Sequence, residues 1–211
     1  MTGSPIEPWP WLALAGLGLF HGINPAMGWL FAVALGLNRG SRKIVLLSLF
    51  PIALGHALAV AVILSVVIAL GLMLDLAMVT RAAALVLIGW ALWHAMRGHR
   101  QRLRVGMQTG LAGLALWSFL MASAHGAGLM VVPMLLPMCG PEAPIGASGA
   151  IPLALAAVGV HSLAMMVAIA AISVAVYDWI GLGFLRRGWV NLDLIWAGAL
   201  LLCGAVLIAG V

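Results

Sequence analysis

The chain has 211 residues, of which 65% are hydrophobic and only 7% are charged, and its formal net charge at pH 7 is +5. Soluble domains carry about 25% charged residues, so this composition excludes a soluble globular domain and indicates an integral membrane protein. The positive charge does not indicate a nucleic-acid-binding protein, because the cations gather in short segments between apolar stretches.

Six apolar stretches are predicted to cross the membrane as helices, since spanning its ~30 Å core takes roughly 20 helical residues. The first has no Lys or Arg before it and no cleavage signature, so we count it as a span rather than a signal peptide. The expected fold class is therefore an all-α transmembrane domain over residues 1–211. The predicted spans are 10–37, 44–72, 74–96, 107–138, 150–177 and 191–210.

The distribution of cations predicts the orientation of these spans. Cytoplasmic loops of membrane proteins are enriched in Lys and Arg, and nine of the ten cations here fall on alternate loops. With six spans, this places both termini outside the cytoplasm, and we expect a multi-pass protein of a bacterial inner membrane. The nine are Arg39, Arg42, Lys43, Arg97, Arg100, Arg102, Arg104, Arg186 and Arg187, and the exception is Arg81.

The first span contains "LFHGINPAMGWLF" at 19–31, which places polar groups in the middle of an apolar helix. Asn24 follows His21 by three residues and lies on the same helical face. Pro25 removes a backbone hydrogen bond, so local unwinding is expected to free carbonyl oxygens near His21. Met27 adds a thioether to this segment.

Similar segments recur in both halves of the chain. "FHG" at 20–22 returns as "AHG" at 124–126, and "GHALA" at 55–59 is echoed by "VHSLA" at 160–164. His21 and His56 in the first half are 35 residues apart, and His125 and His161 in the second half are 36 residues apart. This predicts two three-helix repeats, 10–96 and 107–210. Because each repeat has an odd number of spans, the second would be inverted in the membrane, as in many transporters.

The four repeated histidines are all predicted to lie near the middle of the membrane, where ionisable residues are usually functional. Neutral imidazole binds transition metals and haem iron, whereas the predicted spans offer no central carboxylate for a calcium or magnesium site. His94 and His99 flank a basic loop and are expected at the interface, as are several tryptophans. The candidate metal ligands are His21, Asn24, Met27, His56, His125 and His161.

Two of these motifs resemble a known family. "HGINPAM" at 21–27 resembles the His-x-x-Glu-Pro-Gly-His element of NicO-type nickel/cobalt efflux proteins, which belong to the LysE-like exporter superfamily. "GHALAVAV" at 55–62 resembles a second-helix element of the same family, with His56 at its histidine. The resemblance covers the first two spans and implies about six helices and transition-metal transport. Asn24 and Met27 stand where that motif carries Glu and the second His.

We therefore expect a transporter, working as an exporter, that moves a transition-metal ion through a midplane histidine site by alternating access of the two repeats. Nickel, cobalt, copper and zinc all remain open as the ion. The alternatives are a haem- or metal-binding membrane subunit or assembly factor, and an accessory subunit with structural histidines. The expected partners are the lipid bilayer and the ion, with a homo-oligomer or a larger membrane complex left open. No nucleophile constellation or nucleotide-binding loop indicates an enzyme.

Overall fold

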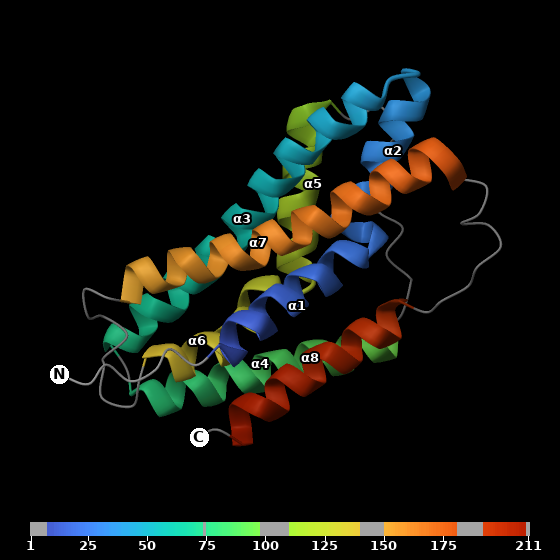
Figure 1. The fold of residues 1–211 in the computed structure, drawn as a ribbon. Helices are drawn as coiled ribbons and strands as arrows, with labels where there is room; N and C mark the ends of the chain where they lie inside the picture. The colour runs from blue at the N-terminus through green and yellow to red at the C-terminus, as the bar shows by residue number, and fades with distance from the viewer. Residues whose placement is uncertain (1–7, 74, 98–109, 140–149, 181–191, 210–211) are drawn as a thin grey trace.

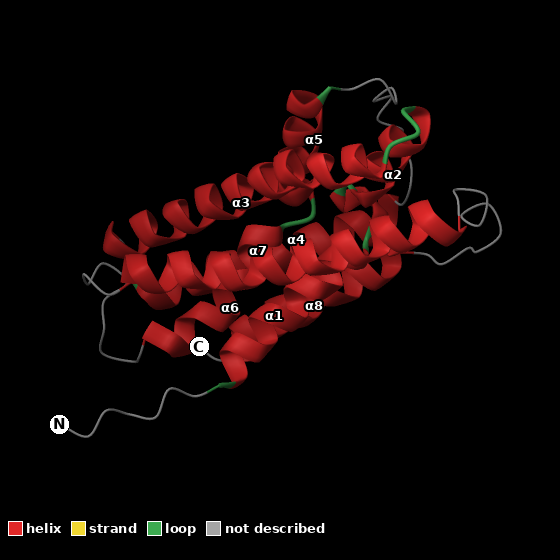
Figure 2. Cartoon of the chain, turned by 45° about the horizontal axis from the view of Figure 1, so that its top comes forward, coloured by secondary structure: helices red, strands yellow, loops and turns green. Residues whose placement is uncertain are grey.

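The computed structural model describes residues 8–73, 75–97, 110–139, 150–180 and 192–209. Within these ranges the regular structure is helical throughout, as Figures 1 and 2 show. Ten elements follow in chain order: α1 Trp9–Ile23, η1 Pro25–Met27, α2 Trp29–Asn38, α3 Arg42–Met73, α4 Leu76–Arg97, α5 Leu111–Ala124, α6 Ala127–Cys139, α7 Ala150–Ala175, the π-helical turn η3 Val176–Ile180, and α8 Leu192–Ala209.

The chain has the helices of a multi-pass membrane protein. Three of them, Arg42–Gly71, Ala77–Met96 and Ile151–Trp179, are long and apolar enough to cross a bilayer. A fourth span results if α5 and α6, which meet at a bend of 57°, are counted as one. Helices α1, α2 and the described part of α8 are apolar but shorter. Among the described residues, the all-α class is confirmed with three or four candidate spans, whereas the six spans and the inverted repeats stay predictions.

The first predicted span is broken at Asn24–Gly28, and its sequence explains why. Asn24 leaves the helical conformation, and its side-chain oxygen accepts the Ala26 N–H at 3.0 Å, while Pro25 starts the short 3-10 turn η1. Gly28 then takes a φ of +119°, in the region open mainly to glycine. A Cβ at this position would also lie 2.9 Å from the Ile52 side chain. Together, Asn24, Pro25 and Gly28 turn the chain from α1 into α2.

Two tryptophans satisfy carbonyl groups at this break. The Trp29 indole N–H donates to the Ile23 carbonyl at 3.0 Å, and that of Trp117, on α5, donates to the Ala26 carbonyl at 3.1 Å. An unsatisfied backbone group in a bilayer core costs several kcal/mol. The indoles therefore allow a non-helical turn inside an apolar bundle.

The second half breaks in a related way between α5 and α6. His125 ends α5, and Gly126 has a φ of +69°. The Trp90 indole N–H donates to the Ala124 carbonyl, and the Trp196 indole N–H donates to the His125 carbonyl at 2.9 Å. Both breaks thus combine a left-handed glycine with two indole caps, so these four tryptophans stabilise the bundle interior rather than anchor the interface.

Each main helix pair joins one helix from the first half of the chain with one from the second half. Helix α1 lies along α7, α3 along α5, and α4 along α8, as Figure 1 shows for the first and last pairs. Small residues bring two of these pairs close together, as is usual in membrane bundles. A Cβ on Gly18 would lie 2.2 Å from the His161 carbonyl oxygen, and one on Gly55 would lie 2.1 Å from that of Ala115.

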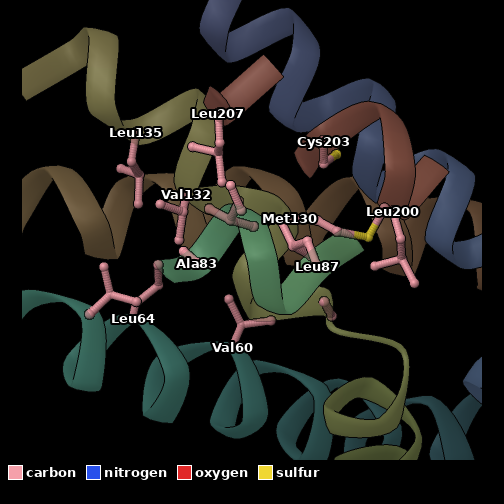
Figure 3. Packing of buried hydrophobic residues seen from close by; sticks show 14 of the residues in the cluster. Val60, Leu64, Ala83, Leu87, Met130, Val132, Leu135, Leu200, Cys203 and Leu207 are labelled. Carbon is pink, nitrogen blue, oxygen red and sulfur yellow. The ribbon is translucent and has the colours of Figure 1, made fainter. Parts of the chain in front are cut away.

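Two apolar clusters form the core. The larger joins α1 and the helices from α3 to α8, and Figure 3 shows its packing around Leu87, Met130 and Leu200. The smaller joins η1, α2, α3, α5, α7 and η3, and includes Met27, Ile52 and Met165. Large apolar side chains also cover much of the exposed surface, among them Leu12, Phe50, Leu85, Leu155, Leu163 and Leu202. A surface of this kind favours contact with a lipid bilayer.

Candidate metal-binding site

Three of the four repeated histidines meet inside the bundle. His21 comes from the last turn of α1, His56 from the middle of α3, and His161 from the middle of α7. Their ring centroids are 5.6 Å apart for His21–His56, 4.9 Å for His21–His161 and 5.4 Å for His56–His161. All three side chains are fully buried. We call these residues the histidine triad.

Hydrogen bonds orient two rings of the triad. His21 Nδ1 donates to the Leu17 carbonyl at 3.0 Å, and His161 Nδ1 donates to the Leu14 carbonyl at 3.3 Å. Since a carbonyl can only accept, each Nδ1 carries a proton, and in the neutral ring Nε2 then holds the lone pair. Metal-ligating histidines typically donate their second nitrogen in this way, which fixes both the tautomer and the ring orientation.

Four ring nitrogens of the triad are buried and have no hydrogen-bond partner among the residues that the structure describes. They are Nε2 of His21, Nε2 of His161, and both nitrogens of His56. An unsatisfied buried polar group costs about 1–3 kcal/mol, and native proteins contain few of them. Four such atoms in one cluster therefore indicate a site for a ligand that imidazole can bind.

The three rings of the triad are not turned towards one common centre. His56 and His161 are nearly parallel, with an angle of 21° between their planes, whereas His21 stands at 74° to His56 and 80° to His161. Accordingly, the described residues contain no group of three His, Cys, Asp or Glu side chains already arranged to hold a metal ion. Coordination by all three rings requires at least one of them to rotate about its side-chain bonds.

Asn24 and Met27, the secondary ligands expected from sequence, are both buried, and each interacts with other parts of the protein. The Asn24 side-chain oxygen accepts the Ala26 N–H and caps η1. Met27 packs in the smaller apolar cluster, which also contains Met165, one helical turn beyond His161. The expected unwinding beside His21 is present, and its carbonyl groups at Ile23 and Ala26 accept the indole N–H groups of Trp29 and Trp117.

The indole of Trp196 lies between His125, the fourth repeated histidine, and His21 of the triad. The Trp196 ring packs edge-on against His21, with centroids 4.5 Å apart, and against His125 at 5.0 Å. Trp196 also stacks on Phe20 at 5.3 Å. Trp196 was not among the predicted site residues, because a lone tryptophan near the start of an apolar span does not indicate a site. His94, expected at the interface, lies 6.1 Å from His125.

The acidic side chains that the structure describes lie away from the triad. Asp75 precedes α4 and bonds the Ala77 N–H, and Asp178 lies in η3, 3.5 Å from Arg42. Glu7, Glu142 and the side chain of Asp193 fall outside the described part, as does His99. Among the described residues, the triad is therefore a group of imidazoles without an acidic partner.

No protein-family model, curated protein or solved structure matches this chain.

Proposed function

We propose that this protein is a membrane transporter, working as an exporter, that binds a transition-metal ion at the histidine triad. One observation carries the proposal: three fully buried imidazoles from three helices meet, and four of their nitrogens have no hydrogen-bond partner in the described part of the chain. Zinc, copper, nickel and cobalt ions all accept imidazole ligands. The resemblance of "HGINPAM" and "GHALAVAV" to nickel/cobalt efflux motifs supports the same class of substrate.

The ligand chemistry of the site favours an ion of low charge. A divalent cation among neutral, buried groups lacks a compensating carboxylate and is expensive to desolvate. Thioethers select monovalent copper, and Met27 and Met165 are buried in the apolar cluster that shares α3 and α7 with the triad. We therefore expect Cu⁺ to bind more tightly than Ni²⁺, Co²⁺ or Zn²⁺.

Transport is supported by the way in which the helices surround the triad. In the proposed arrangement, α1 with α2, and α5 with α6, each make one broken crossing, so the chain crosses six times. Packing of α1 on α7, α5 on α3, and α4 on α8 is what two inverted three-helix repeats would give. Transporters of this type bind substrate near broken helices at the repeat interface and rock one repeat against the other.

The proposed export requires a defined orientation. Arg42, at the start of α3, lies 3.5 Å from Asp178, beyond the end of α7. This contact supports a common membrane face for the loops that follow α2 and η3, both of which carry cations. By the positive-inside rule that face is cytoplasmic, with both termini on the opposite side, as in a bacterial inner membrane.

Metal binding by the purified chain in lipid nanodiscs tests the proposal. Cu⁺, Zn²⁺, Ni²⁺ and Co²⁺ are titrated singly, and the bound metal is measured together with the optical spectrum. The informative variant is His56→Phe, which keeps a ring but removes both nitrogens. Ser48→Ala, two turns earlier on α3, is a matched control because it removes a buried polar group already bonded within its own helix.

We expect wild type and Ser48→Ala to bind metal tightly, and His56→Phe to lose at least tenfold in affinity while remaining folded. Liposomes that contain the wild type should then accumulate the ion, and those with His56→Phe should not. Absence of metal binding in the wild type would contradict the proposal. A Soret band in the purified protein would favour the alternative, a haem-binding membrane subunit.

A further inference from the structure

A second pair of histidines lies on the other side of Trp196. His94, in the last turn of α4, and His125, at the α5–α6 break, have ring centroids 6.1 Å apart. The separation is close to those within the triad, and these rings come from elements distant in sequence. Trp90 and Trp93 pack against His94 at 5.5 and 5.1 Å and hold it in place.

Both rings of this pair are oriented as those of His21 and His161 are. His94 Nδ1 donates to the Trp90 carbonyl at 3.1 Å, and His125 Nδ1 donates to the Met121 carbonyl at 2.8 Å. The bonded carbonyl fixes the proton on Nδ1, so Nε2 holds the lone pair in each neutral ring. The pair therefore presents two imidazole ligands of the same tautomer as the triad.

Trp196 separates this pair from the triad. Its indole packs edge-on against His125 on one side and His21 on the other. Its N–H donates to the His125 carbonyl, and an indole offers no lone pair to a metal ion. Trp196 is therefore a partition between two groups of imidazoles, and an ion that passes between them requires it to move.

The two groups differ in how close they lie to solvent. The triad is fully buried, His125 is 9% exposed, and His94 is partly exposed near the end of α4. Helix α4 leads into the Arg-rich segment that the proposed topology places in the cytoplasm. Burial thus increases stepwise from His94 through His125 to the triad.

We propose that His94 and His125 form a second binding site, at which the transition-metal ion is held between the cytoplasm and the histidine triad, with Trp196 separating the two sites. This inference rests on the proposed transport function. Two imidazoles bind an ion more weakly than three, so an ion at the outer site exchanges quickly with the cytoplasm. The outer site raises the rate at which the triad is filled without changing the affinity of the triad.

The test compares binding with transport in the full-length chain. His94→Phe keeps a ring against Trp90 and Trp93 but removes the ligating nitrogen. Met96→Phe is the control, because it places a phenylalanine at an 83% exposed position in the same turn of α4. Affinity is measured in nanodiscs, and the initial transport rate in proteoliposomes, with Cu⁺, Zn²⁺, Ni²⁺ and Co²⁺ offered singly. His125→Phe serves as a second variant of the outer site.

We expect His94→Phe to bind at the triad within about twofold of wild type but to transport at least tenfold more slowly, with Met96→Phe unchanged. Transport by His94→Phe at the wild-type rate would overturn the outer site and leave the proposed function intact. Loss of triad binding in His94→Phe would also overturn it, since His94 would then shape the triad. A wild type that neither binds nor transports metal contradicts the proposed function itself.

Discussion

The imidazoles of the triad are arranged in a way that packing alone does not explain. A structural histidine in a membrane bundle normally satisfies its ring nitrogens with carbonyl groups or other side chains. Here His56 has two buried nitrogens, and none of the described residues bonds either of them. At about 1–3 kcal/mol for each such group, the metal-free protein is destabilised by the residue that a bound ion would satisfy.

His56→Phe should have opposite effects on stability relative to wild type with and without metal. Without metal, the variant should unfold at the same temperature as wild type or higher, because it removes two unsatisfied polar atoms and keeps a ring. With Cu⁺ at a hundred times the wild-type dissociation constant, wild type should gain about 2.7 kcal/mol, and the variant, which binds at least tenfold more weakly, about 1.4 kcal/mol or less. Thermal unfolding in detergent, with a copper chelator as the metal-free condition, measures both. A lower unfolding temperature of the metal-free variant would mean that the imidazole stabilises the fold.

Sequence reasoning identified the residues of the triad but not the full arrangement. His21, His56 and His161 were found because the repeated segments place them at equivalent positions. Equal spacing also suggested that His125 would join them, but the two halves break at different points. His21 lies three residues before its break, within α1, whereas His125 lies at the break itself. This shift directs the fourth imidazole towards Trp196 and His94.

At the scale of elements, the two helix breaks share one construction. Each has a glycine with positive φ and two carbonyl groups capped by indole N–H groups, one of which comes from a helix of the other half of the chain. Trp117 caps the first break from α5, and Trp90 caps the second from α4. A break built in this way is rigid rather than frayed, so it can hold His21 and His125 in fixed positions. Proline predicted the first break, but nothing in the sequence predicts which indole caps which carbonyl.

The first break depends on Gly28, which we expect Gly28→Ala to show. An alanine at φ +119° is strained by roughly 1–2 kcal/mol, and its Cβ would also displace the Ile52 side chain. The variant should therefore be destabilised by about 2 kcal/mol and lose metal affinity, since Ile52 lies one turn from His56. Gly159→Ala, in α7, is the matched control because a Cβ there meets no atom within 4 Å. Chemical unfolding and metal titration of both variants measure the difference. Equal stabilities of the two variants would contradict the assigned backbone conformation.

For the molecule as a whole, composition predicted the helical class and its long apolar helices, but hydropathy did not predict the helix breaks inside two of the expected spans. Residues 10–37 and 107–138 were each predicted as one span, and each contains two helices separated by a break. Hydropathy averages over a break because the residues that form it are few and are flanked by apolar ones. The pairing of helices from the two halves depends on close contacts at glycines such as Gly18 and Gly55. Such contacts are not visible in hydropathy.

The proposed inverted arrangement requires α3 and α7 to cross the membrane in opposite directions, and single cysteines test this. Arg42→Cys and Asp178→Cys, in a chain with Cys139→Ser and Cys203→Ser, should react with an impermeant maleimide only from the cytoplasmic side. Both positions are accessible, with side chains 57% and 25% exposed.

Asp75→Cys, beyond the far end of the 32-residue helix α3, should react only from the opposite side, since that helix is about 48 Å long. A flexible bismaleimide should cross-link the double variant with cysteines at 42 and 178, because Arg42 Nη2 lies 3.5 Å from Asp178 Oδ2. Labelling of positions 42 and 178 from opposite sides would exclude antiparallel α3 and α7, and with them the inverted repeats on which alternating access depends.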